Sequence, residues 1–259
     1  MPEWAHFPLI LGPNGKLSKR DGAKYGFPVF AMNWTDPNSK ELTEGFREKG
    51  FLPEAFLNLL ALLGWNDGTE KEIFSKEELI DHFSMDRVHS AGARFDYEKA
   101  KWFNHEWIKR STHLAAMVEP LLNEAGITIE DHIKLEQVLE LVKERCHLLP
   151  EFVQQTGFFF KAPVDHDLEA VRGKWNEEKK NFFLDYCDKL ETTNDWQAAA
   201  MEEAFKQLAA EKNIKAGELQ LPYRIMLVGG KFGPPVFQIA EILGKQETIN
   251  RIRQVVALI

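Results

Sequence analysis

Apolar residues at helical spacing, interrupted by Gly and Pro, most constrain what this chain can fold into. Pro53 suits the first position of a helix. Leu59 and Leu63 then lie on one apolar stripe, which Gly64 ends. Patterns of this kind follow one another to the C-terminus and predict a mainly α fold.

Local signals mark where several helices begin and end. Ser75 and Glu78 form the sequence of a capping box, and Asp96 suits the residue before a helix that continues through Ile108. Helical spacing also runs from Leu135 to Leu149, where Pro150 breaks it. Further helices are predicted over Glu41–Lys49 and Leu114–Leu122, over residues of about 167–190, 195–212 and 221–229, from Pro234 and Pro235, and after Gly244.

The first 30 residues differ from the rest of the chain. Glycines at 12, 15, 22 and 26 and prolines at 8, 13 and 28 are typical of strand and loop. Residues 31–40 are expected to form an inserted loop. The fold therefore begins with a short strand and loop segment and continues with helices.

Composition narrows the class of protein. Of 259 residues, 44% are apolar and 28% charged, which favours a folded core over disorder. The net charge of -8 argues against binding nucleic acid by bulk attraction, but local basic surfaces remain possible because salt screens distant charges. Cys146 and Cys187 are too few and too far apart for a zinc knuckle or a disulfide framework. No apolar run spans a membrane and no signal peptide begins the chain, so we expect a cytoplasmic protein without a membrane partner.

A basic motif lies just after the apolar run Phe7–Leu11. It consists of Lys16, Leu17, Ser18, Lys19 and Arg20. Two ammonium groups and a hydroxyl on a loop after a strand suit a polyphosphate. Taken alone, the motif is more often a solvated basic loop.

Four stretches, in order, resemble the bacterial glutamyl-tRNA synthetases, a family of class I aminoacyl-tRNA ligases. The basic motif is similar to the second signature of that class. The other three are Lys49–Ala55 continuing to Trp65, Phe95–Asn104, and Leu221–Arg224 continuing to Lys245. The resemblance runs from about residue 5 to the end. It implies a remnant of the catalytic domain over residues 1–30, a stem-contact helical domain over 31–150 and an all-helical anticodon-binding domain over 151–259.

The resemblance also implies an activity for the full-length parent. Such an enzyme uses ATP to form glutamyl-adenylate and then transfers glutamate to tRNA. Residues 16–20 would hold the ATP phosphates, with Lys19 touching ATP and Arg20 serving as a loop anchor or a tRNA contact. The first class signature, His-x-Gly-His, is not found, so ATP and glutamate would be bound through a catalytic domain missing here. We expect the chain alone to be inactive; participation in acylation is the alternative.

The same resemblance places residues that read the anticodon. They are Arg145, Arg224, Gly233, Pro234 and Val236. An arginine fork can bond a base edge with two hydrogen bonds. The alternative for Arg145 is a solvated cation near a helix end. Arg224 follows Pro222 in what we expect to be the first turn of a helix, where the dipole disfavours a cation and a functional partner is therefore favoured. Arg145 is also the residue expected to bear on the third anticodon base, which separates glutamate from glutamine tRNA.

Other conspicuous residues have structural interpretations. Phe158–Phe160 is interpreted as a buried connector, and four tryptophans are expected in the core: Trp102, Trp107, Trp175 and Trp196. Phosphate contacts and a solvated face are both open for Lys231, Lys245, Arg251 and Arg253. No group of residues resembles a metal site. The sequence therefore predicts a monomer that binds glutamate tRNA, against the alternative of a helical protein-interaction module with an incidental basic loop.

Overall fold

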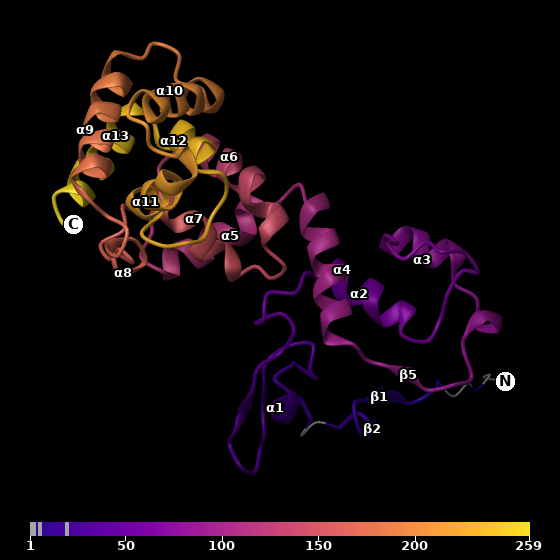
Figure 1. The fold of residues 1–259 in the computed structure, drawn as a ribbon. Helices are drawn as coiled ribbons and strands as arrows, with labels where there is room; N and C mark the ends of the chain where they lie inside the picture. The colour runs from indigo at the N-terminus through magenta and orange to yellow at the C-terminus, as the bar shows by residue number, and fades with distance from the viewer. Residues whose placement is uncertain (1–3, 5–6, 19–20) are drawn as a thin grey trace. The chain divides into compact units, whose positions relative to one another are not determined.

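The chain folds into two compact units, each described separately. The structure, a computed structural model, describes residues 4, 7–18 and 21–259, with only the backbone of Asp21 and Ala23. The first unit comprises Met1–Met117 and Lys143–Glu151, and the second comprises Val118–Val142 and Phe152–Ile259. Helices make up most of the second unit and are the main regular structure of the first (Figure 1), which confirms the mainly α class. No helix among the described residues is long and apolar enough to cross a membrane.

Short strands open the first unit. Strand β1 (Ile10–Gly12) pairs antiparallel with β2 (Gly15–Lys16) and parallel with β5 (Ala93–Arg94). A strand was predicted before the basic motif, and β1 confirms it. The pairing with β5 was not predicted, because it joins residues about 80 positions apart in a segment that carries no strand pattern.

The helix predicted over Glu41–Lys49 is wrong. Strands β3 (Trp34–Thr35) and β4 (Leu42–Thr43) form a hairpin there and in the expected loop 31–40. The Asp36 carboxylate accepts hydrogen bonds from the backbone N–H groups of Asn38 and Ser39, which fixes the turn. Turn chemistry in Asp-Pro-Asn-Ser thus overrides the helix-forming residues that follow it.

The α-helices of the first unit begin where the sequence predicts, except for the first, which lies in the segment 1–30 that was expected to form only strand and loop. They are α1 (Asp21–Tyr25), α2 (Pro53–Leu62), α3 (Lys76–His82) and α4 (Tyr97–Arg110), with 3-10 helices at Met85–Arg87 and Lys143–Arg145. Ser75 and Glu78 form the capping box of α3, and the Asp96 carboxylate caps α4. Helices α2 and α4 pack together over a core that contains Phe51, Leu59 and Phe103.

The second unit is built from helices alone within the described residues. They are α5 (Leu114–Glu124, which begins in the first unit), α6 (His132–Val142), α7 (Glu151–Phe160), α8 (Glu169–Arg172), α9 (Glu177–Thr192), α10 (Ala198–Glu211), α11 (Ala216–Val228), α12 (Val236–Leu243) and α13 (Lys245–Val256). Helix α9 lies beside α13 (Figure 1), and its rings Phe182 and Tyr186 meet Phe205 and Tyr223 in the core.

Three helix predictions in this part of the chain need correction. The pattern 135–149 is not one helix, because α6 ends at Val142 and a 3-10 turn follows. Phe158–Phe160 is the end of α7 and not a connector, although Phe158 and Phe159 are buried as expected. Helix α11 begins at Ala216, so Arg224 lies in its interior. The dipole argument for Arg224 is therefore wrong: Pro222 is inside the helix and marks no start.

Two side chains differ from their expected environments. Trp102 was expected in the core but is 36% exposed on α4. Arg251 was expected on the surface but is only 4% exposed. Its Nη1 donates to the carbonyl oxygen of Leu227 at 2.6 Å, and its Nε to Glu247 at 2.7 Å. The guanidinium can be buried because these two hydrogen bonds replace those that it would make to water.

Candidate functional site

The loop between α11 and α12 contains Gly233 and Pro234, and two more of the predicted anticodon-reading residues, Arg224 and Val236, lie on the helices that flank it. It begins at Gly229, which ends α11 in the left-handed conformation with φ 82°. The Gly229 carbonyl accepts a hydrogen bond from the Asp167 N–H at 2.8 Å. A Cβ at Gly229 would lie 2.6 Å from the Asp165 carbonyl oxygen, so this close approach needs glycine.

Arg224 holds the far end of this loop. Its Nη1 donates to the carbonyl oxygens of Phe232 and Gly233 at 3.0 Å each and to that of Pro234 at 2.7 Å. Three of the predicted residues are therefore together, and Val236, buried at 5% exposure, begins α12 immediately afterwards. The loop backbone is fixed by a charge-assisted cluster, which preorganises it for a ligand.

Sequence reasoning did not single out Phe232, which belongs to the same loop. Its half-buried ring meets Phe158 of α7 edge to face, with 6.0 Å between the ring centres. Gly233 follows with φ 98°, a conformation that only glycine adopts readily. The signal that could have found Phe232 is its place in the turn-rich run Gly-Gly-Lys-Phe-Gly-Pro-Pro. Lys231 is exposed and forms an ion pair with Asp167 at 3.3 Å.

Arg145 lies in the other unit. It is the last residue of the 3-10 helix Lys143–Arg145, and its side chain is exposed. The next residue, Cys146, is fully buried, and burial raises the pKa of its thiol to about 12. Arg145 and Arg224 are thus placed by different local structures, one by a 3-10 turn and one by a helix interior.

The basic motif begins at the end of a β-hairpin. Lys16 is exposed on β2, the N–H of Leu17 donates to the Ile10 carbonyl at 2.9 Å, and Ser18 is exposed. Lys19 and Arg20 lie outside the described residues. The described part therefore presents an ammonium and a hydroxyl on the surface, which suits an anion.

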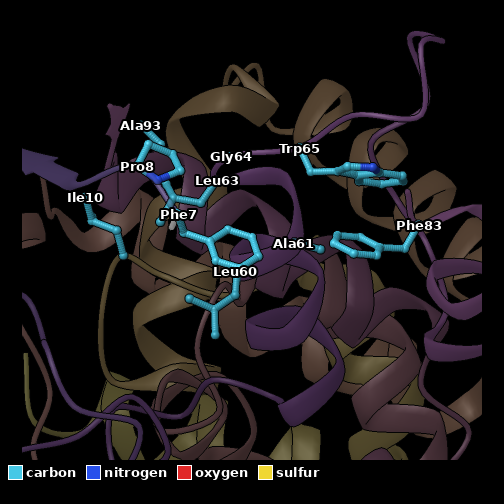
Figure 2. Close-up of a pocket in the computed structure, with 10 residues that line it drawn as sticks. All are labelled: Phe7, Pro8, Ile10, Leu60, Ala61, Leu63, Gly64, Trp65, Phe83 and Ala93. Carbon is cyan, nitrogen blue, oxygen red and sulfur yellow. The ribbon is translucent and has the colours of Figure 1, made fainter. Parts of the chain in front are cut away.

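An apolar pocket of about 320 Å³ lies next to this hairpin in the first unit (Figure 2). Phe7 and Leu60 both line it, and the rings of Trp65 and Phe83 lie side by side with 5.7 Å between their centres. Phe7 is 63% exposed and Phe83 44%. The described residues that line the pocket include no titratable side chain, so it offers contact surface and no acid–base chemistry.

Metal ligation has no support in the part of the chain that the structure describes, where no group of three His, Cys, Asp or Glu side chains is close enough to hold an ion. Cys187, like Cys146, is buried, and burial raises the pKa of its thiol to about 11. Thiols with such values stay protonated near neutral pH and are poor nucleophiles.

Comparison with known proteins assigns these loops to a family. An anticodon binding domain matches residues 113–256, and the catalytic domain of class I tRNA synthetases (E and Q) matches residues 1–102. A glutamate–tRNA ligase of Flavobacterium johnsoniae is 45% identical over 260 residues, which cover 99% of this chain and 51% of that protein. The chain belongs to the glutamate–tRNA ligase family.

Solved structures agree with this assignment. A crystal structure of a glutamate tRNA ligase from Elizabethkingia meningosepticum, in complex with its amino acid, aligns with a TM-score of 0.89 at 38% identity. The alignment covers 99% of this chain and 52% of that one. A glutamate–tRNA ligase of Porphyromonas gingivalis is 41% identical and is covered over 52% of its length. The chain thus spans about half the length of the curated relatives it matches.

Proposed function

We propose that this chain is the stem-contact and anticodon-binding portion of a glutamate–tRNA ligase and that it binds glutamate tRNA as a monomer. The observation that carries the proposal is the loop of residues 229–235, held by Arg224 within the region that matches an anticodon binding domain. A preorganised loop with a half-buried ring suits unpaired bases, which stack on aromatic faces and expose their edges to side chains.

The predicted roles follow from this loop. Gly233, which is half-buried, would form part of the surface against which an anticodon base packs, and the buried residues Pro234 and Val236 would support it from beneath. Arg224 would combine two tasks, because it already binds the loop carbonyls and its guanidinium carries five N–H donors in all. Arg145 would read a second base from its exposed position.

The proposal extends to ATP in the full-length parent. Lys16 and Ser18 are exposed beside β2, a placement that fits a loop contacting phosphate oxygens. Bound ATP would supply the adenylyl group that activates glutamate. In that arrangement Lys16 and Lys19 would neutralise phosphate charge, Ser18 would donate a hydrogen bond, Leu17 would belong to the same loop, and Arg20 would anchor the loop or contact tRNA. The division at residues 30 and 150 and the cytoplasmic location stay predictions.

A mobility-shift titration tests the tRNA-binding part. The chain is titrated with glutamate tRNA and, as the matched control, with an unrelated tRNA of equal length at the same salt concentration. We expect tighter binding to glutamate tRNA and a linear fall of log affinity with log salt, because phosphate contacts release counterions. Equal retardation of both tRNAs, or none of either, would contradict the proposal and favour a helical protein-interaction module.

A further inference from the structure

Residues 143–151 are held in the first unit although the residues on both sides of this segment belong to the second. The side chain of Asn104 on α4 provides one anchor. It is fully buried, and its Nδ2 donates to the His147 carbonyl at 2.6 Å and to the Gly50 carbonyl at 3.1 Å. Its Oδ1 accepts from the Leu52 N–H at 2.7 Å. One amide thus joins the segment to the residues that precede α2.

His105, the next residue of α4, provides a second anchor. Its Nδ1 lies 2.9 Å from the Cys146 carbonyl oxygen. A carbonyl only accepts hydrogen bonds, so Nδ1 carries the proton. The His105 ring also stacks on the His147 ring, with 4.6 Å between centres. Consecutive residues of the segment are therefore bound by consecutive residues of the helix.

The segment also binds the backbone at Gly50. The Leu149 N–H donates to the Gly50 carbonyl at 3.2 Å. Gly50 has φ 90°, and a Cβ there would lie 2.7 Å from the Leu149 nitrogen and would collide with Pro150. Farther along, the Glu151 carboxylate accepts from the His147 N–H at 2.7 Å. Both N–H and carbonyl of His147 are thus occupied.

These bonds fix the backbone immediately after Arg145 and leave its side chain exposed. We propose that Asn104 and His105 are positioning residues for tRNA recognition: they hold residues 146 and 147 so that the Arg145 guanidinium is presented to an RNA base. The inference rests on the proposed function. It adds two residues that touch no RNA themselves and act through Arg145.

The first test changes Asn104 to Asp. Asn104→Asp keeps an acceptor for the Leu52 N–H but faces the Gly50 and His147 carbonyl oxygens with a carboxylate that cannot donate. Asn58→Asp is the matched control. Asn58 is also fully buried; it accepts from the Phe74 N–H and the Trp107 Nε1 and donates to the Glu72 carbonyl. It makes as many bonds as Asn104, but none to residues 143–151.

Two measurements are made on the full chain. Hydrogen exchange of the His147, Leu148 and Leu149 amides should accelerate by tenfold or more in Asn104→Asp and stay unchanged in Asn58→Asp. Binding of glutamate tRNA is then measured in a double-mutant cycle with Arg145→Ala. We expect Arg145→Ala to weaken binding about tenfold, Asn104→Asp to weaken it similarly, and the double variant to lose little more.

A second pair of variants tests the inference independently if Asn104→Asp does not fold. His105→Phe keeps a ring against His147 but has no donor for the Cys146 carbonyl. His105→Asn restores a donor near the position of Nδ1. We expect His105→Phe to weaken tRNA binding and His105→Asn to recover most of it, a rescue that lost packing alone would not produce.

The outcomes separate the two proposals. A wild-type chain that binds no tRNA overturns the proposed function and this inference with it. If the wild type binds but Arg145→Ala changes nothing, only the inference fails. Additive losses in the cycle, unchanged exchange in Asn104→Asp, or no difference between the two His105 variants would also overturn the inference alone.

Discussion

At two loops of this molecule one side chain from a neighbouring helix makes three hydrogen bonds, but by different chemistry. Arg224 binds three carbonyl oxygens of loop 229–235 through one charged nitrogen. Asn104 binds two carbonyls and one N–H through a neutral amide that is fully buried. A guanidinium can only donate, so it suits a loop that presents carbonyls; an amide does both, so it suits a junction of segments. Under the proposed function Arg224 also contacts RNA, whereas the buried Asn104 amide acts only through the segment that it binds.

The largest loss of stability should come from substitution of Asn104. Asn104→Ala leaves the Leu52 N–H and the Gly50 and His147 carbonyls without their buried partner, and each loss of this kind costs about 1–3 kcal/mol. We expect the free energy of unfolding to fall by about 3 kcal/mol or more, measured by urea denaturation. A fall below about 1 kcal/mol would mean that water or a rearranged segment replaces these bonds.

Substitution of Arg224 should lower the free energy of unfolding by less than substitution of Asn104, because Arg224 is only half-buried. Arg224→Ala should lower the free energy of unfolding by about 2 kcal/mol through loss of charge-assisted bonds. Arg224→Lys retains a cation for the carbonyls but not the planar fork. If Arg224 reads a base, the Lys variant should stay folded and bind glutamate tRNA about 1–3 kcal/mol more weakly. Unchanged binding would limit Arg224 to loop support.

Loop 229–235 also depends on the backbone of Gly233. Gly233→Ala places a Cβ on a residue with φ 98° and should destabilise the chain by about 1–2 kcal/mol, measured by thermal unfolding. Gly217→Ala is the control, because Gly217 lies in α11 with open space where a Cβ would be added, and helix propensity should stabilise it by about 0.5–1 kcal/mol. Equal effects of both changes would contradict the strain at Gly233.

Acid should destabilise the folded chain through His147, which lies in the segment bound by Asn104. Burial, and next the neighbouring His105, lower the pKa of His147 from 6.5; Glu151 and Glu98 oppose this and Lys101 adds to it. The unfolded chain therefore takes up the proton first, so stability is full above about pH 6.5 and declines as the pH falls below it. Urea midpoints between about pH 7.5 and 5 should show this loss in the wild type, and a smaller one in His147→Gln.

His166 is a second group in the same pH range. Burial, and next the charge of Arg251, lower its pKa from 6.5. The variant His166→Gln therefore serves as the control for the second unit. If both variants retain the full pH dependence of the wild type, other groups titrate in this range.

The sequence by itself determined the features that depend on residues close together in the chain. Ser75 with Glu78 and Asp96 mark the starts of α3 and α4, because a cap is satisfied within three residues along the chain. The glycine and proline signals likewise separated α12 from α13. The same local reasoning failed over Glu41–Lys49, where a turn at Asp36 forms a hairpin. The resemblance brought Arg224 and Gly233 to attention, but not the bonds between them.

Only the tertiary structure decided which side chains hold the loops. Asn104 meets residues about 50 positions earlier and about 40 later, and Phe232 meets a ring more than 70 positions away. Helix and strand periodicity do not predict contacts between residues so far apart in the sequence. A buried polar group takes whichever partners the fold brings to it, because leaving it without a hydrogen bond is costly and water is excluded. Local sequence signals determine where the helices begin and end, and tertiary packing determines which side chains form hydrogen bonds and ring contacts.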